Sequence, residues 1–413
     1  MKKLLGVAIQ LLLCLVFCVL GSHTAAAQNL VIRHARIIVG NGNVIDDGSI
    51  VVRDGRITSV SAGNVNARGA QTIDAHGFSA VPGFIDAHRH VFPRGDAEKW
   101  LKTQAAASMQ QFLDAGYTTL LSGAGPVPGI LELKQMIDSG KMKGPRIIAS
   151  EAIPLRNITP DEARAQVRKY AGMDIHFIGE EGLSDKPTPA ELEVLRAIVD
   201  ESKKLNGVYV MVHAVTPEAM MDSVAAGAPL LVHTPHFGWV TAAQAQQVAA
   251  AHVLELSTIG FGVPVFGVFK NDNNPRFRDG APWPSGVIND EGLGQSAGYK
   301  AVNARTVWDA GVVYGYGTDT NYEPKAGLSH ELRSLNLMFS PQDLIKLMGP
   351  NTAAFIQMSD QLGTLEPGKL ADIVLVAGNP LDGYWNLLNT RVVIKGGVIV
   401  SDQRKNPAPA EDH

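Results

Sequence analysis

The sequence predicts an α/β protein, in which a (β/α)8 TIM barrel carries a small composite β-sandwich domain built from both chain ends. Short apolar strands alternate with helical stretches between residues 82 and 358. Strand-like segments with turn residues occupy 28–81 and return at 359–403. Residues that can bind metal follow several predicted strands. Because eight βα units suit a barrel whose active site gathers at the C-terminal strand ends, we expect these residues to share one cavity.

Residues 1–27 have the pattern of a secretory signal peptide: two lysines, an apolar run and a short alanine series. We therefore expect an exported protein, periplasmic or secreted, with no stable membrane anchor, because the apolar run is short for a membrane span. Cys14 and Cys18 both lie in this segment. The mature chain would then have neither a disulfide nor a thiolate metal ligand.

The composition is that of an ordinary globular protein. Hydrophobic residues make up 45% and charged residues 18% of the 413 residues, and the formal net charge is −4. A mildly acidic chain without a basic stripe gives no reason to expect a nucleic-acid partner. The length suffices for one barrel and one small domain.

The two ends are expected to fold together. Asp54-Gly55 separates two alternating runs and is a strong hairpin signal. Further strands are predicted at 371–376 and 391–400, and the polar tail 404–413 is expected to be flexible.

The middle segment supplies eight predicted strands. Their expected ends lie near Asp86, Ser122, Ser150, Ile178, Val212, Val232, Ser257 and Gly317. Four helix starts combine a hydroxyl residue, a proline and acidic residues, at Thr159, Thr188, Thr216 and Ser340. The stretch 260–298, rich in Gly, Pro and Asn, is expected to be a long loop, either a lid over the site or a structural flap.

The pair His88 and His90 follows a short apolar strand. Side chains two apart on an extended backbone point to the same face, so both imidazoles can bind one divalent ion. Arg89 between them is expected to point out of the barrel lumen and to pair structurally.

His213, His233 and Asp319 also follow predicted strands. Imidazoles and a carboxylate without thiols suit Zn²⁺ or a related divalent ion. Each residue has an ordinary alternative, a hydrogen-bonded core histidine or, for Asp319, a helix cap. Their joint placement at strand ends favours a metal centre.

Such a centre predicts hydrolysis. A bound metal lowers the pKa of water from about 16 toward about 7. Asp319 can take the proton of that water and pass it to the leaving group. The metal or a protonated His233 can stabilise the oxyanion, so Asp319 and His233 are the expected catalytic residues. Amides, carbamates, lactones and cyclic imides are the candidate bonds.

The remaining histidines are not predicted to be metal ligands. His236 and His330 could face the substrate, although surface roles are equally open. Structural roles are expected for His34, His76, His252 and His413.

At these residues the chain resembles the amidohydrolase superfamily, and within it the imidazolonepropionase-like and secreted prolidase-like members. The resemblance spans nearly the whole mature chain and includes the motifs at 82–90, 317–319 and 365–374. It implies a metal-dependent barrel with His88, His90, His213, His233 and Asp319 at the metal centre.

One departure from the family concerns the fourth strand. Members with two metals often carry a carboxylated lysine there, and by spacing Phe177 occupies its place. Glu180 could replace the lysine, but an ordinary loop carboxylate is the commoner outcome. The resemblance therefore favours one metal ion, held by His88, His90, His213 and Asp319. His233 would be a further ligand or would polarise the substrate carbonyl.

The leading hypothesis is an exported amidohydrolase that cleaves a C–N bond in a small-molecule amide or dipeptide-like substrate. A mononuclear-metal deaminase, a lactone or carbamate hydrolase, and a non-catalytic metal- or ligand-binding relative are the alternatives. The sequence specifies neither the substrate nor the oligomeric state.

Overall fold

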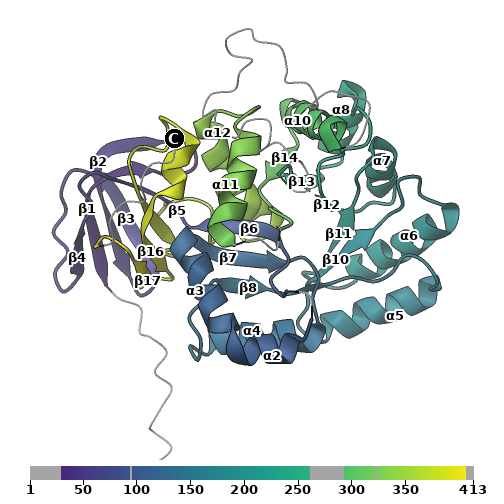
Figure 1. The fold of residues 1–413 in the computed structure, drawn as a ribbon, viewed down its shortest axis with the longest axis horizontal. Helices are drawn as coiled ribbons and strands as arrows, with labels where there is room; N and C mark the ends of the chain where they lie inside the picture. Colours follow the sequence, from purple (N-terminus) through teal and green to yellow (C-terminus); the bar gives the residue numbers. More distant parts are fainter. Residues whose placement is uncertain (1–28, 94, 261–292, 321–322, 406–413) are drawn as a thin grey trace, which may run out of the picture.

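The computed structural model describes residues 29–93, 95–260, 293–320 and 323–405. The predicted signal peptide, most of the predicted loop and most of the tail lie outside these residues. A β-rich domain occupies one end of the molecule and an α/β barrel the other (Figure 1). No helix within the described ranges is long and apolar enough to cross a bilayer.

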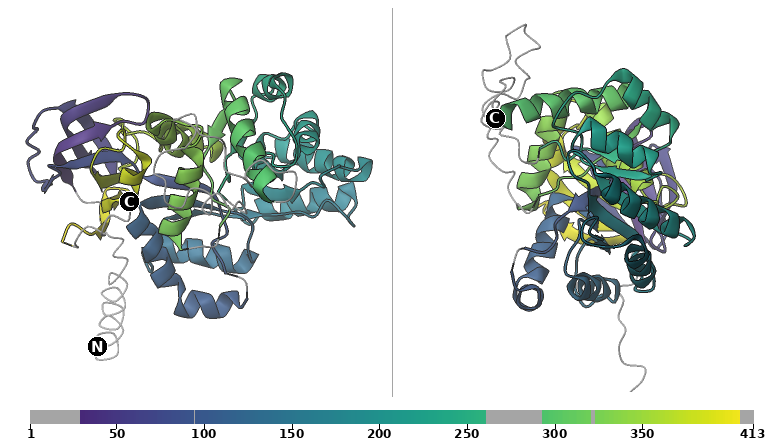
Figure 2. Two further views of the ribbon diagram at one scale, coloured as in Figure 1. Left: turned by 45° about the horizontal axis from the view of Figure 1, so that its top comes forward. Right: turned by 90° about the vertical axis from the view of Figure 1, so that its right-hand side faces the viewer.

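The β-rich domain combines both ends of the chain, as predicted. Its sheet has the strand order β17-β16-β15-β5-β1-β2-β3, with β4 also paired to β1. The antiparallel pairing of β15 with β5 joins the two chain ends, so purple and yellow strands lie side by side in Figures 1 and 2. The strands are β1 (Leu30–Ile38), β2 (Val44–Arg53), β3 (Arg56–Ala62), β4 (Gln71–Asp74), β5 (Phe78–Pro82), β15 (Ile373–Ala377), β16 (Thr390–Lys395) and β17 (Val398–Asp402).

The predicted hairpin is confirmed. Arg53 pairs with Arg56, and the two residues between them, Asp54 and Gly55, have φ of +48° and +77°. A two-residue turn with positive φ at both positions matches the right-handed twist of the flanking strands.

Strand β15 of this sheet is buried on both faces. Ile373 and Leu375 of β15 belong to the apolar core of the β-rich domain, whereas Val374 and Val376 belong to the core that includes the barrel helices. Successive side chains of a strand point to opposite faces, so β15 connects the two cores.

The barrel strands are parallel and follow the predicted order. They form β6–β7–β8 and β9–β10–β11–β12–β13–β14, with only Ala149 between β8 and β9. The amide of Ala87 donates to the carbonyl of Tyr316 at 3.2 Å and that of Asp319 to the carbonyl of His88 at 2.8 Å, which links the last strand region to the first. Their bounds are Phe84–Arg89, Tyr117–Ser122, Arg146–Ile148, Ser150–Glu151, Phe177–Gly182, Tyr209–His213, Leu230–Val232, Leu254–Leu256 and Val313–Gly315 for β6 to β14.

Helices surround the strands, and all four predicted starts are confirmed. The side chains of Thr159, Thr188, Thr216 and Ser340 each accept a backbone N–H from the first turn. α10 begins at Leu293, so the end of the segment predicted as a loop to residue 298 is helical. The helices are α2 (Ala97–Thr103), α3 (Ala105–Ala115), α4 (Val127–Asp138), α5 (Pro160–Ala171), α6 (Pro189–Lys203), α7 (Pro217–Ala225), α8 (Ala242–Ala250), α10 (Leu293–Asp309), α11 (Pro324–Leu335), α12 (Pro341–Lys346) and α13 (Thr352–Phe355), with a π-helical turn at Leu347–Asn351 and a 3₁₀ turn at Tyr384–Leu388.

The barrel interior is a packed apolar core. Phe177, Met211 and Leu256 meet there with Phe355 of α13. Filling the lumen with side chains leaves the strand ends as the place where polar groups can gather.

Candidate metal centre

Six ionisable side chains converge at the C-terminal ends of the barrel strands. They make three overlapping groups, in each of which the potential ligand atoms lie within 4.8 Å of one another. All five residues predicted from the sequence are included, and the sixth is Glu180. The groups are His88–His90–Glu180, His88–His233–Asp319 and Glu180–His213–His233.

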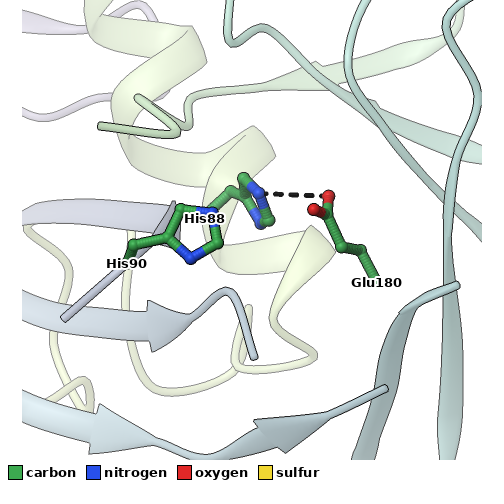
Figure 3. A group of neighbouring side chains, drawn as sticks. All are labelled: His88, His90 and Glu180. Carbon is green, nitrogen blue, oxygen red and sulfur yellow. Dashed lines mark ion pairs between the residues drawn. The ribbon is translucent and has the colours of Figure 1, made fainter. Parts of the chain in front are cut away.

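The two histidines of the first strand are placed as their spacing predicts. The side chain of His88 is fully buried, whereas that of His90 is 41% exposed. Their ring centroids are 5.5 Å apart. The Glu180 carboxylate faces His88, with Oε2 3.2 Å from Nε2 (Figure 3).

Glu180 lies at the centre of the group. Its Oε2 is 3.0 Å from Nε2 of His233 and 3.4 Å from Nδ1 of His213. The expectation of an ordinary loop carboxylate is therefore wrong: Glu180 belongs to β10, which runs to Gly182 rather than ending near Ile178.

Phe177 does not occupy a position among the potential ligands. It is the first residue of β10, and it packs in the barrel interior with its ring 5.6 Å from that of Tyr209. On this strand the side chain that reaches the histidines is Glu180, three residues further on.

Asp319 contacts both histidines of the first strand. Its Oδ1 is 2.9 Å from Nε2 of His90 and 3.3 Å from Nε2 of His88. The alternative role as a helix cap is wrong, because Glu323 is the N-cap of α11.

Asp86 fixes the segment that carries Asp319. Its carboxylate accepts hydrogen bonds from the amide and the hydroxyl of Thr318, at 3.0 and 2.6 Å. These contacts join the first strand to the residue before Asp319. This role of Asp86 was not predicted from the sequence, although Asp86 lies two residues before His88.

The electrostatics of the site favour bound positive charge. Burial disfavours a charged His88, but Glu180 and Asp319 outweigh it and hold the pKa of His88 well above its ordinary value. Burial would raise the pKa values of the two carboxyls, yet the neighbouring histidines lower both, that of Glu180 well below its usual range. Two ionised carboxylates thus lie within a largely buried site.

His233 has the opposite tendency. Burial lowers its pKa to about 4, and the neighbouring His213 adds to the effect. Its ring centroid is 4.3 Å from that of His213. A neutral imidazole is the form that binds a metal ion.

The other candidate residues lie outside this group. Arg89 points to the outer layer as predicted, where it donates to Thr318 and Thr320 and lies over the ring of Phe112. Within the described residues neither His236 nor His330 belongs to a ligand group.

Comparison with known proteins agrees with this architecture. The amidohydrolase family model matches residues 79–400. An imidazolonepropionase from Geobacillus kaustophilus is 24% identical over 408 residues, which cover 88% of this chain and 92% of that protein. A dihydroorotase from Streptococcus pneumoniae is 26% identical over 194 residues, which cover 44% of this chain and 43% of that protein.

Solved structures show the same fold. A protein described as a putative prolidase from Bifidobacterium longum superimposes with a TM-score of 0.75 at 24% identity, covering 94% of this chain and 97% of that one. A Xaa-Pro dipeptidase with bound methionine gives a TM-score of 0.74 at 22% identity, covering 90% and 99%. With a family match across the barrel and the C-terminal strands of the β-rich domain, and with His, Glu and Asp side chains gathered at the strand ends, the chain belongs to the amidohydrolase family.

Proposed function

We propose that the protein is an exported, metal-dependent hydrolase that cleaves an amide-type C–N bond in a small molecule or dipeptide. The observation that carries this proposal is the convergence of four imidazoles and two carboxylates at the C-terminal ends of the barrel strands, which we call the barrel mouth. The names of two relatives, an imidazolonepropionase and a Xaa-Pro dipeptidase, support this reaction class and make dipeptides the first substrates to test. Export rests on the predicted signal peptide at 1–27.

The donor set fits divalent metal. Nitrogen and oxygen ligands without thiols suit Zn²⁺ and related borderline ions. The carboxylates of Glu180 and Asp319 attract positive charge, and in the chain alone the proton of His88 provides part of it. A divalent ion would displace this proton, so metal binding should release protons and weaken at low pH.

We infer two ions rather than the single ion favoured by the sequence. A single ion bound as expected needs His213 and Asp319 in one ligand group, but among the described residues these two share none. Glu180 instead belongs to one group with His88 and to another with His213. Glu180 would therefore be the shared ligand, in the role that the family resemblance gives to a carboxylated lysine.

The protein groups can then divide the chemistry. Divalent ions held by these residues would supply water acidified at neutral pH and would polarise a carbonyl oxygen. Asp319 takes a proton from the attacking water as the water oxygen adds to the carbonyl carbon. Asp319 then gives this proton to the leaving nitrogen as the C–N bond breaks. His233 is neutral near pH 7, which supports a role as ligand rather than as a cationic stabiliser of the oxyanion.

Metal analysis and a substrate panel test this proposal together. Protein without residues 1–27 is reconstituted with Zn²⁺, and metal per chain is measured by mass spectrometry. The protein is then assayed on dipeptides, N-acyl amino acids, lactones and amines. We expect about two ions per chain and hydrolysis of a C–N bond that stops when a chelator removes the metal.

A matched pair of variants makes the test specific. Glu180→Gln should lower the metal content by at least one ion per chain, whereas Glu193→Gln, an exposed residue of α6, should leave it unchanged. Unchanged zinc content in Glu180→Gln would contradict the shared-ligand role. Activity without metal would refute the proposed reaction, and ammonia release from amines with no amide cleavage would assign a deaminase instead.

A further inference from the structure

We propose that Thr258 is a positioning residue that holds the imidazole of His233 for metal binding. The inference rests on the proposed function, because it assigns His233 to the metal centre. It adds a residue outside the six potential ligands. Thr258 lies just after β13, two residues beyond Leu256.

The contact itself is short and buried. Oγ1 of Thr258 is 2.7 Å from Nδ1 of His233, while Nε2 of the same ring is 3.0 Å from the Glu180 carboxylate. His233 is 3% exposed and Thr258 is fully buried. Nδ1 therefore faces Thr258, with Oδ2 of Asp319 further away at 3.8 Å, and Nε2 faces the proposed ligand Glu180.

This arrangement selects one tautomer. A neutral imidazole carries a single N–H, and the nitrogen that binds a metal must keep its lone pair. With Nε2 facing Glu180, the proton belongs on Nδ1, which donates it to Oγ1 of Thr258. Hydrogen bonds of this type to metal-binding histidines fix the ring orientation and raise the basicity of the ligand.

The backbone of Thr258 gives independent support. Its φ is +41°, a left-handed conformation that a β-branched residue rarely adopts. His233, directly after the preceding strand β12, has φ of +75°. Such conformations persist where surrounding contacts impose them, and they gather at functional sites.

Those surrounding contacts are present on both sides of Thr258. Lys300 of α10, which is almost fully buried, donates from Nζ to the Thr258 carbonyl at 3.2 Å. The carboxylate of Glu331 in α11 accepts the amides of Ile259 and Gly260, at 2.8 and 2.6 Å. The Thr258 amide donates to the carbonyl oxygen of Gly317 at 3.0 Å. The backbone around Thr258 is thus held by two helices and by the segment after β14, which places the hydroxyl at His233.

Three variants separate positioning from a structural role. Thr258→Ala removes the hydroxyl and also the β-branch, so the left-handed conformation becomes less unfavourable. Thr258→Ser keeps the hydroxyl. Thr390→Ala is the control, because Thr390 is a buried threonine of the β-rich domain whose hydroxyl donates to the carbonyl of Ala115. For each variant we measure Zn²⁺ affinity by chelator competition, and Tm without added metal.

We expect Thr258→Ala to lower zinc affinity about 10- to 100-fold, with Tm unchanged or higher. Thr258→Ser should retain near wild-type affinity, and Thr390→Ala should change Tm without changing affinity. With a substrate, Thr258→Ala at saturating zinc should lower kcat more than it raises KM. Unaltered zinc affinity in Thr258→Ala, or failure of Thr258→Ser to restore it, overturns the positioning role. Absence of zinc binding in the wild type would instead refute the proposed function.

Discussion

The β-rich domain and the barrel mouth place their charges in opposite environments. In the β-rich domain the ion pairs His34–Asp74 and Arg36–Asp46 are largely exposed, and the core is apolar. At the mouth, Glu180 and Asp319 are ionised although largely buried. Burying a charge is costly unless it is paired or binds a metal. The buried charges that form the ligand site at the mouth therefore lower the stability of the folded chain, whereas apolar burial in the β-rich domain raises it.

The two regions also differ in which residues adopt a left-handed backbone conformation. The hairpin of the β-rich domain places Asp54 and Gly55 in the left-handed region, where such residues are common. At the mouth the left-handed residues are His233, Thr258 and Asp319. Conformations that disagree with local preference are expected where neighbouring strands impose them for function. Substitutions in one region should change stability, and those in the other should change activity or metal binding.

The largest effect is expected for Asp319→Asn. Removing the general base should lower kcat about 10²- to 10⁴-fold while Tm changes little. Steady-state hydrolysis of the best substrate, with Tm on the same sample, is the measurement. Asp200→Asn on the exposed face of α6 serves as the control. Full activity in Asp319→Asn would remove the proposed base from the mechanism.

Ile50→Ala tests the other side of the comparison. Ile50 is fully buried in the core of the β-rich domain, where it pairs with Ile32 and Val60. The cavity should cost about 2–5 kcal/mol of unfolding free energy, with zinc per folded chain unchanged. Denaturant unfolding and metal analysis are the readouts, and Val44→Ala, exposed on the same strand, should cost far less. Loss of zinc from the folded variant would mean that the two regions are coupled.

Glu255 extends the comparison to a buried carboxyl outside the site. Burial raises its pKa from 4.5 to about 8. Between these values the unfolded chain has lost the proton that the folded chain keeps, so stability falls as pH rises. Glu255 should contribute about 2–4 kcal/mol to this fall between pH 5 and 8.

Denaturant unfolding at both pH values measures the contribution. Glu255→Gln should lose less stability from pH 5 to 8 than the wild type. Part of the dependence should remain, because burial also raises the pKa of Glu331. Identical pH dependence in variant and wild type would show that Glu255 is not protonated in the folded chain.

The smallest effect is expected for Thr188→Ala. Thr188 caps α6 in a capping box with Glu191, and neither residue belongs to a ligand group. Loss of the cap should cost about 1 kcal/mol, with no change in kcat or zinc content. Thermal unfolding detects the shift, and Thr188→Ser should restore the stability. A change in kcat would show that this helix affects the mouth.

Much of the fold could be predicted because its signals are local. Helix starts can be predicted from N-cap residues, because capping depends on neighbours within one turn. The four that were predicted are Thr159, Thr188, Thr216 and Ser340. The Asp54-Gly55 turn is equally local. The predictions were wrong where pairing between neighbouring strands determines the structure. The end of β10 was predicted too early, and the role of Glu180 was misjudged for that reason.

The sequence by itself determined the order of elements and the presence of ligand-type residues after the strands, since strand period, capping and side-chain chemistry are encoded residue by residue. Only the tertiary structure decided which carboxylate lies between the histidines, that Asp86 and Thr258 support the proposed ligands, and that Asp319 contacts His88 and His90. These relations depend on the closure of the barrel, which brings together residues separated by up to about 230 positions. No local pattern encodes such a distance.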